Sequence, residues 1–251
     1  MDYCIVVAIG AVIGSFLNVC ISRISREESI IYPPSHCEKC QNRLSPLELI
    51  PIFSYIFLRG RCSHCKSTIE KYYTVIEISN LVLYLLIYYK FGLSILTLKY
   101  FILTSLLIVI AMIDYKTQFV YTSTTILGSI IGIIFIIIQA FMYDSGAINL
   151  ILGGLIGFFI ISTIIFITRG MGTGDVEIAV VCGLFLGAKG VLVGLLLAII
   201  IGGIIGIIIL ALGIKDLKEK IAFGPFIAFG TILSMLYCNE IIIKYLELFN
   251  I

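Results

Sequence analysis

Charged residues are scarce in this chain of 251 residues. Asp, Glu, Lys and Arg together make up 13% of the sequence, whereas 60% of it is hydrophobic and the mean hydropathy is +1.14. Soluble globular domains carry about 25% charged residues, so this shortage excludes an ordinary soluble domain. The formal net charge of only +2 also argues against a nucleic-acid-binding surface, and we expect no nucleic-acid partner.

The short segments of alternating hydrophobicity that build a transmembrane β-barrel are lacking. Apolar stretches of about twenty residues recur instead, and a helix of that length crosses about 30 Å of hydrocarbon. The sequence therefore predicts an all-α polytopic membrane protein with about eight transmembrane helices. We expect these helices at residues 3–22, 72–89, 95–113, 119–142, 147–167, 176–188, 190–213 and 222–243.

No basic residue precedes the first apolar stretch, which argues for a retained first helix rather than a cleaved signal. The one sizeable polar region is 23–71. If it faces the cytoplasm, 13 of the 17 Lys and Arg residues lie on that side, as the positive-inside rule requires. We therefore expect both termini outside, and a division into a first helix (1–22), a cytoplasmic region (23–71) and a transmembrane part (72–251).

Acidic residues at or inside the ends of the expected helices number four: Glu77, Asp114, Asp175 and Glu177. Asp114 and Asp175 fall at similar depth on the cytoplasmic side. Glu177 is two residues after Asp175, about 200° around a helix, so the two do not easily face one site. Two close carboxylates cannot both ionise; the ionised one can activate a water while the protonated one polarises a carbonyl.

Other interpretations of these aspartates stay open on the residues alone. Asp114 fits a helix-end residue in the headgroup region that pairs with Lys116, and Asp175 fits an N-terminal residue favoured by the helix dipole. A proton or ion path in a transporter is a further alternative. It would need ionisable residues along the helix interiors, and the stretches 119–142, 147–167 and 190–213 carry none.

Four of the eight cysteines lie in the polar region as two pairs, Cys37 with Cys40 and Cys62 with Cys65. Paired C-x₂-C motifs are typical of a tetrahedral zinc site, although the 21-residue spacer is slightly long. The reducing cytoplasm disfavours disulfides. We predict a structural zinc that folds this small insertion, rather than free thiols. His36 and His64 are alternative ligands, but we interpret them as exposed neighbours.

The chain resembles the type IV prepilin peptidases, which are leader peptidases and N-methyltransferases, along nearly its whole length. Gly172-Thr173-Gly174-Asp175 matches the GxGD motif of intramembrane-type aspartyl proteases. The other matching blocks are 14–23, 35–40, 49–55, 59–62, 113–114 and 223–226, around the two cysteine pairs.

This resemblance implies that Asp114 and Asp175 are the catalytic pair. The family cleaves the basic leader of prepilin or pseudopilin substrates after a glycine, at the cytoplasmic face of the cell membrane. It then methylates the new amino terminus with S-adenosylmethionine. A methyltransferase site would have to form from the zinc region, the 14–23 helix end and either Glu70 or Glu77. Glu77 fits equally well a carboxylate paired with Arg or Lys at the membrane interface.

Two departures from the family pattern stand out. Many relatives have a Pro-Asp pair where this chain has Tyr121-Thr122, which leaves Asp114 as the one carboxylate of its block. Glu177 replaces a residue that is often Lys in relatives. A peptidase that has lost methyl transfer is the main alternative to the bifunctional enzyme.

Overall fold

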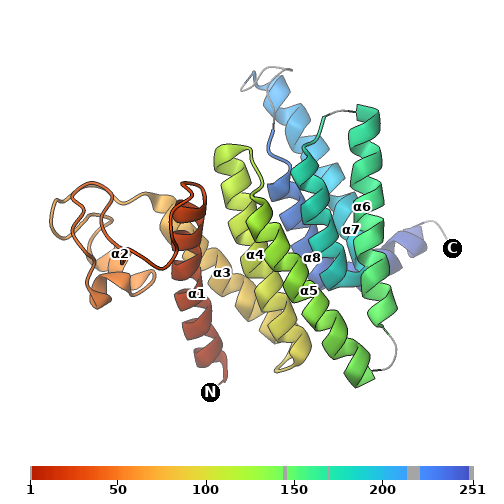
Figure 1. Cartoon of the computed structure of the whole chain (residues 1–251), viewed down its shortest axis with the longest axis horizontal. Helices are drawn as coiled ribbons and strands as arrows, with labels where there is room; N and C mark the ends of the chain where they lie inside the picture. The colour runs from red at the N-terminus through yellow and green to blue at the C-terminus, as the bar shows by residue number, and fades with distance from the viewer. Residues whose placement is uncertain (1, 144–145, 169, 214–220, 249–251) are drawn as a thin grey trace. The chain divides into compact units, whose positions relative to one another are not determined.

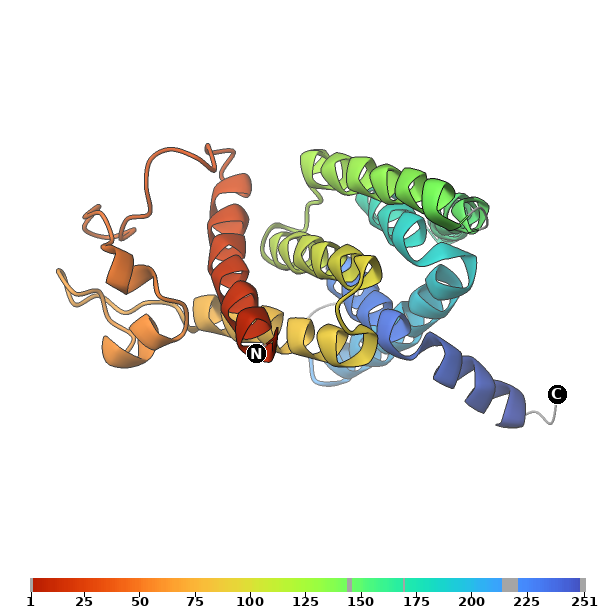
Figure 2. The same ribbon diagram turned by 90° about the horizontal axis from the view of Figure 1, so that it is seen from below.

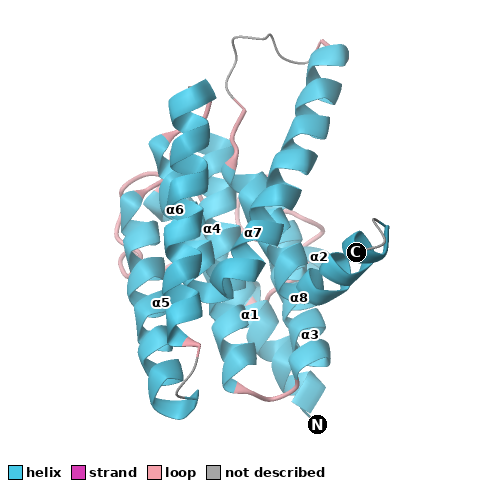
Figure 3. Ribbon diagram, turned by 90° about the vertical axis from the view of Figure 1, so that its right-hand side faces the viewer, coloured by secondary structure: helices cyan, strands magenta, loops and turns pink. Residues whose placement is uncertain are grey.

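The computed structural model describes residues 2–143, 146–168, 170–213 and 221–248 (Figure 1). Helices make up the regular structure of this part of the chain (Figure 3), and two isolated bridges pair His36 with Arg43 and Arg61 with Thr68. The chain divides into two compact units, Met1–Val109 and Ile110–Ile251. The helices are α1 (Asp2–Ile24), η1 (Pro46–Leu49), α2 (Phe53–Phe57), α3 (Lys71–Phe91), α4 (Ile95–Thr117), α5 (Thr122–Tyr143), α6 (Ala147–Thr168), α7 (Thr173–Ala211) and α8 (Gly224–Leu248).

Seven of these helices are long and apolar enough to cross a membrane, within the described residues. They are all the helices except η1 and α2. The predicted all-α membrane fold is therefore confirmed, and most helix ends fall within a few residues of expectation. Asp114 lies inside α4, one turn before its end at Thr117, because the apolar run continues into a helical turn of polar residues. Arg169 and the connection at 214–220 lie outside the described residues.

Close contact between α1 and α3 organises the first unit (Figure 2). A Cβ on Gly14 would lie 2.8 Å from the Cα of Glu77, and a Cβ on Gly10 would lie 3.1 Å from the Cα of Leu81. Glycine therefore lets the two backbones meet, as small residues do in membrane bundles. The Asn80 side-chain amide donates to the Gly10 carbonyl over 2.8 Å, which gives a polar group in the bilayer a partner.

Glycines also join α6 to the first half of α7. A Cβ on Gly153 would overlap the Gly183 carbonyl, and a Cβ on Gly157 would overlap the Ala179 carbonyl. The residue number rises along one helix as it falls along the other, so this pair is antiparallel. The contact is closer than larger side chains allow, and it fixes the position of the α7 start.

The chain reverses direction within α7. Gly187 has φ 76° and ψ −178°, a conformation that glycine adopts readily. After it, the second half of α7 packs against α8, where Gly194 meets Thr231 and Gly202 meets Phe226. Both ends of α7 consequently lie at one end of the unit (Figure 1). The predicted helices 176–188 and 190–213 are these two halves.

Replacing Gly153 with alanine tests the tight contact between α6 and α7. We expect Gly153→Ala to destabilise the protein by about 1–3 kcal/mol, because the added methyl group overpacks a rigid backbone contact. The measurement is thermal unfolding of the purified protein in detergent. Gly203→Ala is the matched control, because no atom lies within 4 Å of its added Cβ and alanine favours helix by about 1 kcal/mol. Equal losses in both variants would contradict the packing argument.

Candidate functional site

Asp114 is held by the first residue of α8. The Gly224 N–H donates to its Oδ2 over 2.8 Å, and only 4% of Asp114 is exposed. A Cβ on Gly224 would lie 2.6 Å from that same oxygen. Glycine is required here because any side chain would push the amide away from the carboxylate.

Asp175 lies in the first turn of α7 and folds back on the start of its own helix. Its Oδ2 accepts a hydrogen bond from the Gly172 N–H over 3.0 Å, and 5% of the residue is exposed. Gly174 packs against Val120 so closely that a Cβ would lie 2.5 Å from the valine Cβ. A Cβ on Gly172 would meet its nearest atom, the Asp175 Oδ2, only at 3.9 Å, so Gly174 is the glycine that sterics demand.

The two aspartates lie at the same end of the second unit, Asp114 near the end of α4 and Asp175 in the first turn of α7. Each accepts a hydrogen bond from a backbone N–H. Two buried carboxylates in one electrostatic field favour a state that holds a single proton. A carboxylate pair in such a state can supply one general base and one general acid.

Glu177 is engaged elsewhere. Its carboxylate accepts a hydrogen bond from the Thr125 hydroxyl of α5, as expected from the 200° separation from Asp175. Thr122 is the first residue of α5.

Sequence reasoning missed the part that Gly224 plays. The partner of Asp114 lies 110 positions away, and that contact has no local pattern. The signal that was available is Gly224-Pro225 at the start of an apolar helix, because proline favours the first turn of a helix, where backbone N–H groups have no intrahelical partner.

The four cysteines of the polar region converge, as predicted. The Sγ atoms of Cys37 and Cys65 are 3.8 Å apart, those of Cys40 and Cys62 are 4.0 Å apart, and all four lie within 4.8 Å of one another. Tetrahedral zinc with bonds of about 2.3 Å requires sulfur separations of about 3.8 Å. The quartet therefore fits a metal ion.

Each C-x₂-C pair forms the same turn. The amide of Cys37 donates to the Asn42 carbonyl, and the amide of Cys62 donates to the Ser67 carbonyl. Gln41 and Lys66, which follow the second cysteine of each pair, have φ near +60°. The Ser67 hydroxyl lies 3.1 Å from the Cys65 sulfur and lowers the pKa of this thiol to about 6, which favours the thiolate that metals bind.

The histidines take no part in this group. His36 Nδ1 lies 3.0 Å from the Pro34 carbonyl and His64 Nδ1 lies 2.8 Å from the Ser63 hydroxyl. Among the described residues, the metal-binding group is the cysteine quartet alone.

A cavity of about 300 Å³ lies between the end of α1, the cysteine region and the start of α3. Its size is at the lower end of small-molecule sites. Its wall contains both acidic and basic groups, and it includes Glu70 and Glu77. Hydrogen bonds from Ser63 and from the Ser45 amide hold the pKa of Glu48, a further wall residue, below its usual value. The acidic part of the wall consists of Glu28, Glu38, Glu48, Glu70 and Glu77.

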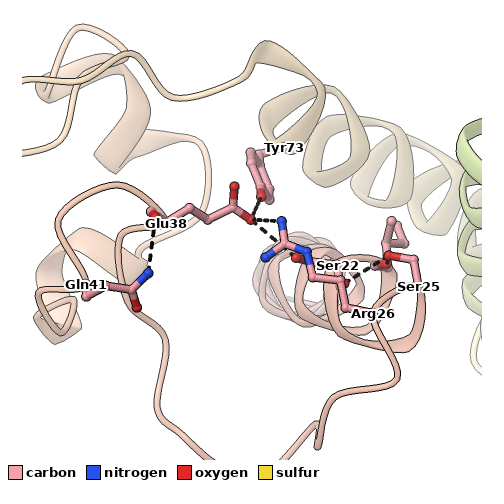
Figure 4. A network of polar contacts seen from close by, with 7 residues as sticks. Ser22, Ser25, Arg26, Glu38, Gln41 and Tyr73 are labelled. Atoms are coloured by element: carbon pink, nitrogen blue, oxygen red, sulfur yellow. Dashed lines mark hydrogen bonds and ion pairs between the residues drawn. The ribbon is translucent and has the colours of Figure 1, made fainter.

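Glu38 ties the cysteine region to both helices (Figure 4). Its Oε1 accepts from Arg26 over 2.8 Å and from Ser22 over 3.4 Å, both near the end of α1, and from the Tyr73 hydroxyl of α3 over 3.3 Å. About half of each charged partner is exposed, so the ion pair alone contributes at most about 1 kcal/mol. The role of Glu38 is to position the cavity wall.

Glu77 pairs with a backbone amide rather than with Arg or Lys. Its Oε2 accepts from the Ile52 N–H over 2.8 Å. Glu77 therefore anchors the segment before α2, instead of forming the charge pair at the membrane interface that was the alternative.

Comparison with known proteins covers both units. The model of the Bacterial Peptidase A24 N-terminal domain matches residues 8–91, and the model of the Type IV leader peptidase family matches residues 101–207. A prepilin leader peptidase/N-methyltransferase of Bacillus subtilis is 32% identical over 240 residues, which cover 95% of this chain and 96% of the relative. The chain belongs to the type IV leader peptidase family.

Other relatives with the same name agree with this membership. The protein of Pseudomonas putida is 25% identical across 96% of this chain and 92% of its own length. That of Neisseria gonorrhoeae is 28% identical across 90% and 85%. No solved structure gives a significant match. The cysteine quartet lies in the first matched segment, and both aspartates lie in the second.

Removing one cysteine tests the metal centre. We expect Cys37→Ser to reduce bound zinc from one ion per chain to a small fraction of that, because three thiolates leave a tetrahedral site open to exchange. Elemental analysis of protein purified without chelators gives the measurement. Cys238→Ser in α8, outside the quartet, is the matched control and should keep its zinc. Full zinc content in the Cys37 variant would reject the site.

Proposed function

We propose that this protein removes the leader peptide of prepilin-like substrates by aspartyl catalysis and methylates the amino terminus that cleavage exposes. The observation that carries the peptidase assignment is the buried pair of Asp114 and Asp175, each held by a backbone amide. The relatives' names, prepilin leader peptidase/N-methyltransferase, support both activities. A transporter is not favoured, since no relative reported above carries such a name.

The carboxylates divide the work of amide hydrolysis. The ionised one takes a proton from water, and the oxygen of that water attacks the scissile carbonyl. The protonated one donates to the carbonyl oxygen. The first carboxyl group then passes the proton from water to the leaving amine nitrogen, and the second recovers its proton from a hydroxyl of the tetrahedral intermediate as the C–N bond breaks.

Orientation follows from charge. The positive-inside distribution supports a cytoplasmic location for residues 23–71 and for the ends of α4 and α7 that carry the aspartates. Such a site meets a basic leader on the cytoplasmic face of the cell membrane, while the apolar helix of the substrate stays in the bilayer. Both termini of this protein are then outside. Cleavage after a glycine rests on the family resemblance.

Methyl transfer belongs, in this proposal, to residues 23–71 with the adjoining ends of α1 and α3, and cleavage to 72–251. The cavity beside the zinc site would hold S-adenosylmethionine, which supplies an electrophilic methyl group when bound. The acidic wall complements its positive charge, and Tyr73 and Tyr55 in the wall offer aromatic faces for a cation or a base. Zinc bound by Cys37, Cys40, Cys62 and Cys65 would keep the wall folded.

Neutral replacement of either aspartate tests the catalytic pair. Asp114→Asn or Asp175→Asn should reduce leader cleavage by about 10²–10⁴-fold or more, because the site loses its acid or its base. The measurement is the size shift of a purified prepilin-like substrate in proteoliposomes. Glu177→Gln is the control, since this carboxylate pairs with Thr125, and should cleave normally. Normal cleavage by either Asn variant, with zinc content intact, would reject the pair.

Filling the cavity tests the methyl-transfer assignment separately. Ser22 lines the cavity, and Ser22→Trp should reduce methylation at least tenfold while leader cleavage stays near wild type. Mass spectrometry of the processed substrate reports the mass of the methyl group. Val12→Trp is the matched control on α1, because Val12 is exposed and outside the cavity wall. Unchanged methylation in the Ser22 variant would place the donor elsewhere.

A further inference from the structure

The polar region contains one apolar run that neither activity explains. Residues 49–58 read Leu-Ile-Pro-Ile-Phe-Ser-Tyr-Ile-Phe-Leu and form the end of η1 and all of α2. A segment of this composition in a water-filled loop should bury its large side chains. Five of them are exposed instead, and the three most exposed are Phe53 at 62%, Ile56 at 62% and Phe57 at 82%.

The polar and apolar residues of the short helix α2 are distributed in the opposite way to those of a helix that faces water. Its polar residues Ser54 and Tyr55 line the cavity, whereas its apolar residues Phe53, Ile56 and Phe57 are exposed. A surface helix in water has the reverse arrangement. The exposed face is therefore matched to an apolar surrounding.

The depth of α2 follows from its anchor. Glu77, which accepts the Ile52 amide, lies six residues into α3, or about 9 Å along the axis from Lys71. Gly14, against which Glu77 packs, lies ten residues before the end of α1, or about 15 Å from Ile24. The helix α3 has the length of a bilayer crossing. A bilayer that extends to the start of α3 and to the end of α1 would therefore also surround the start of α2. Figure 1 agrees, with α2 beside α1 rather than beyond its end.

Several backbone N–H groups of this segment donate hydrogen bonds within the protein, as an apolar medium requires. The Ser54 amide donates to Ile50, the Ile56 amide to Ile52, the Leu58 amide to Ser54 and the Gly60 amide to Tyr55. Ile52 itself has φ 66°, a strained conformation for a β-branched residue. The Phe53 amide closes this turn on the Pro51 carbonyl at 2.6 Å.

The basic residues that follow α2 also fit a position at the membrane surface. Arg59, Arg61 and Lys66 lie together around a surface hollow that also includes Phe57. Basic side chains next to an immersed aromatic face are attracted to the anionic headgroups of a charged membrane surface. The same basic residues would repel the basic leader of a prepilin-like substrate, which argues against the substrate as the occupant of this face.

We propose that the apolar face of α2, formed by Phe53, Ile56 and Phe57, is inserted in the cytoplasmic leaflet of the bilayer as an interfacial anchor, with Arg59, Arg61 and Lys66 at the headgroups. The partner is the lipid bilayer. The inference stands on the membrane fold alone, and does not depend on either enzymatic assignment.

A single tryptophan measures this insertion, because the chain contains none. Phe57→Trp is reconstituted in bilayers that contain anionic lipid and lipids brominated at defined acyl-chain depths, and fluorescence quenching is compared with quenching by aqueous iodide. We expect strong bromolipid quenching, a blue-shifted emission and at least threefold weaker iodide quenching than in the control. Asn42→Trp is that control: Asn42 is exposed in the polar first C-x₂-C turn and should be quenched by iodide and not by bromolipid.

Two other outcomes would overturn the proposal. Iodide quenching of Phe57→Trp equal to that of Asn42→Trp would place the face in water. Protection from both quenchers would place it against protein, either a second copy or another part of the chain. Phe53→Trp provides an independent reporter on the same face, and zinc content verifies that each variant keeps its fold.

Discussion

The hydrogen bond from the Gly224 amide to Asp114 joins residues 110 positions apart, and the candidate peptidase site depends on it. A carboxylate buried among membrane helices needs a partner, because burial without one costs several kcal/mol. A cation would neutralise the group and remove it from acid–base chemistry. A backbone amide satisfies one oxygen while it leaves the charge and the second oxygen available. This solution requires glycine, because a Cβ at position 224 would occupy the space of the carboxylate oxygen.

The same requirement for close backbone approach recurs wherever the chain must place a polar group at depth. The absence of a Cβ at Gly174 makes room for Val120 beside Asp175, and its absence at Gly14 makes room for the backbone of Glu77. The contact between Gly153 and Gly183 fixes the half of α7 that carries Asp175. In this fold, the glycine contacts that pack the helices therefore also position the polar groups of the sites. The cysteine region solves its own problem differently, since a small polar segment has too little core and needs a metal ion to hold its turns.

Local patterns predicted those features that depend on local physics. Length and hydropathy predicted the helices, and the spacing of Cys37, Cys40, Cys62 and Cys65 predicted their convergence. The predicted helices 176–188 and 190–213 placed a break near Gly187, but its φ of 76° and its contact with Asn149 of α6 have no local pattern. The roles of Gly224 and of the Glu77 carboxylate rest on contacts between distant segments. Composition also concealed α2, because its apolar run is averaged into a region that is polar as a whole.

The position of α2 bears on how two reactions could follow one another on one substrate. Methylation needs the amino terminus that cleavage produces, so cleavage comes first, and the product remains attached to an apolar helix in the bilayer. A methyl-transfer site must therefore open close to the membrane surface. Ser54 and Tyr55 of α2 line the cavity, and Glu77, which anchors the segment before α2, lies about 9 Å inside the start of α3. An immersed outer face of α2 would hold the cavity at that level, where a membrane-anchored amino terminus can reach it without its apolar helix leaving the lipid.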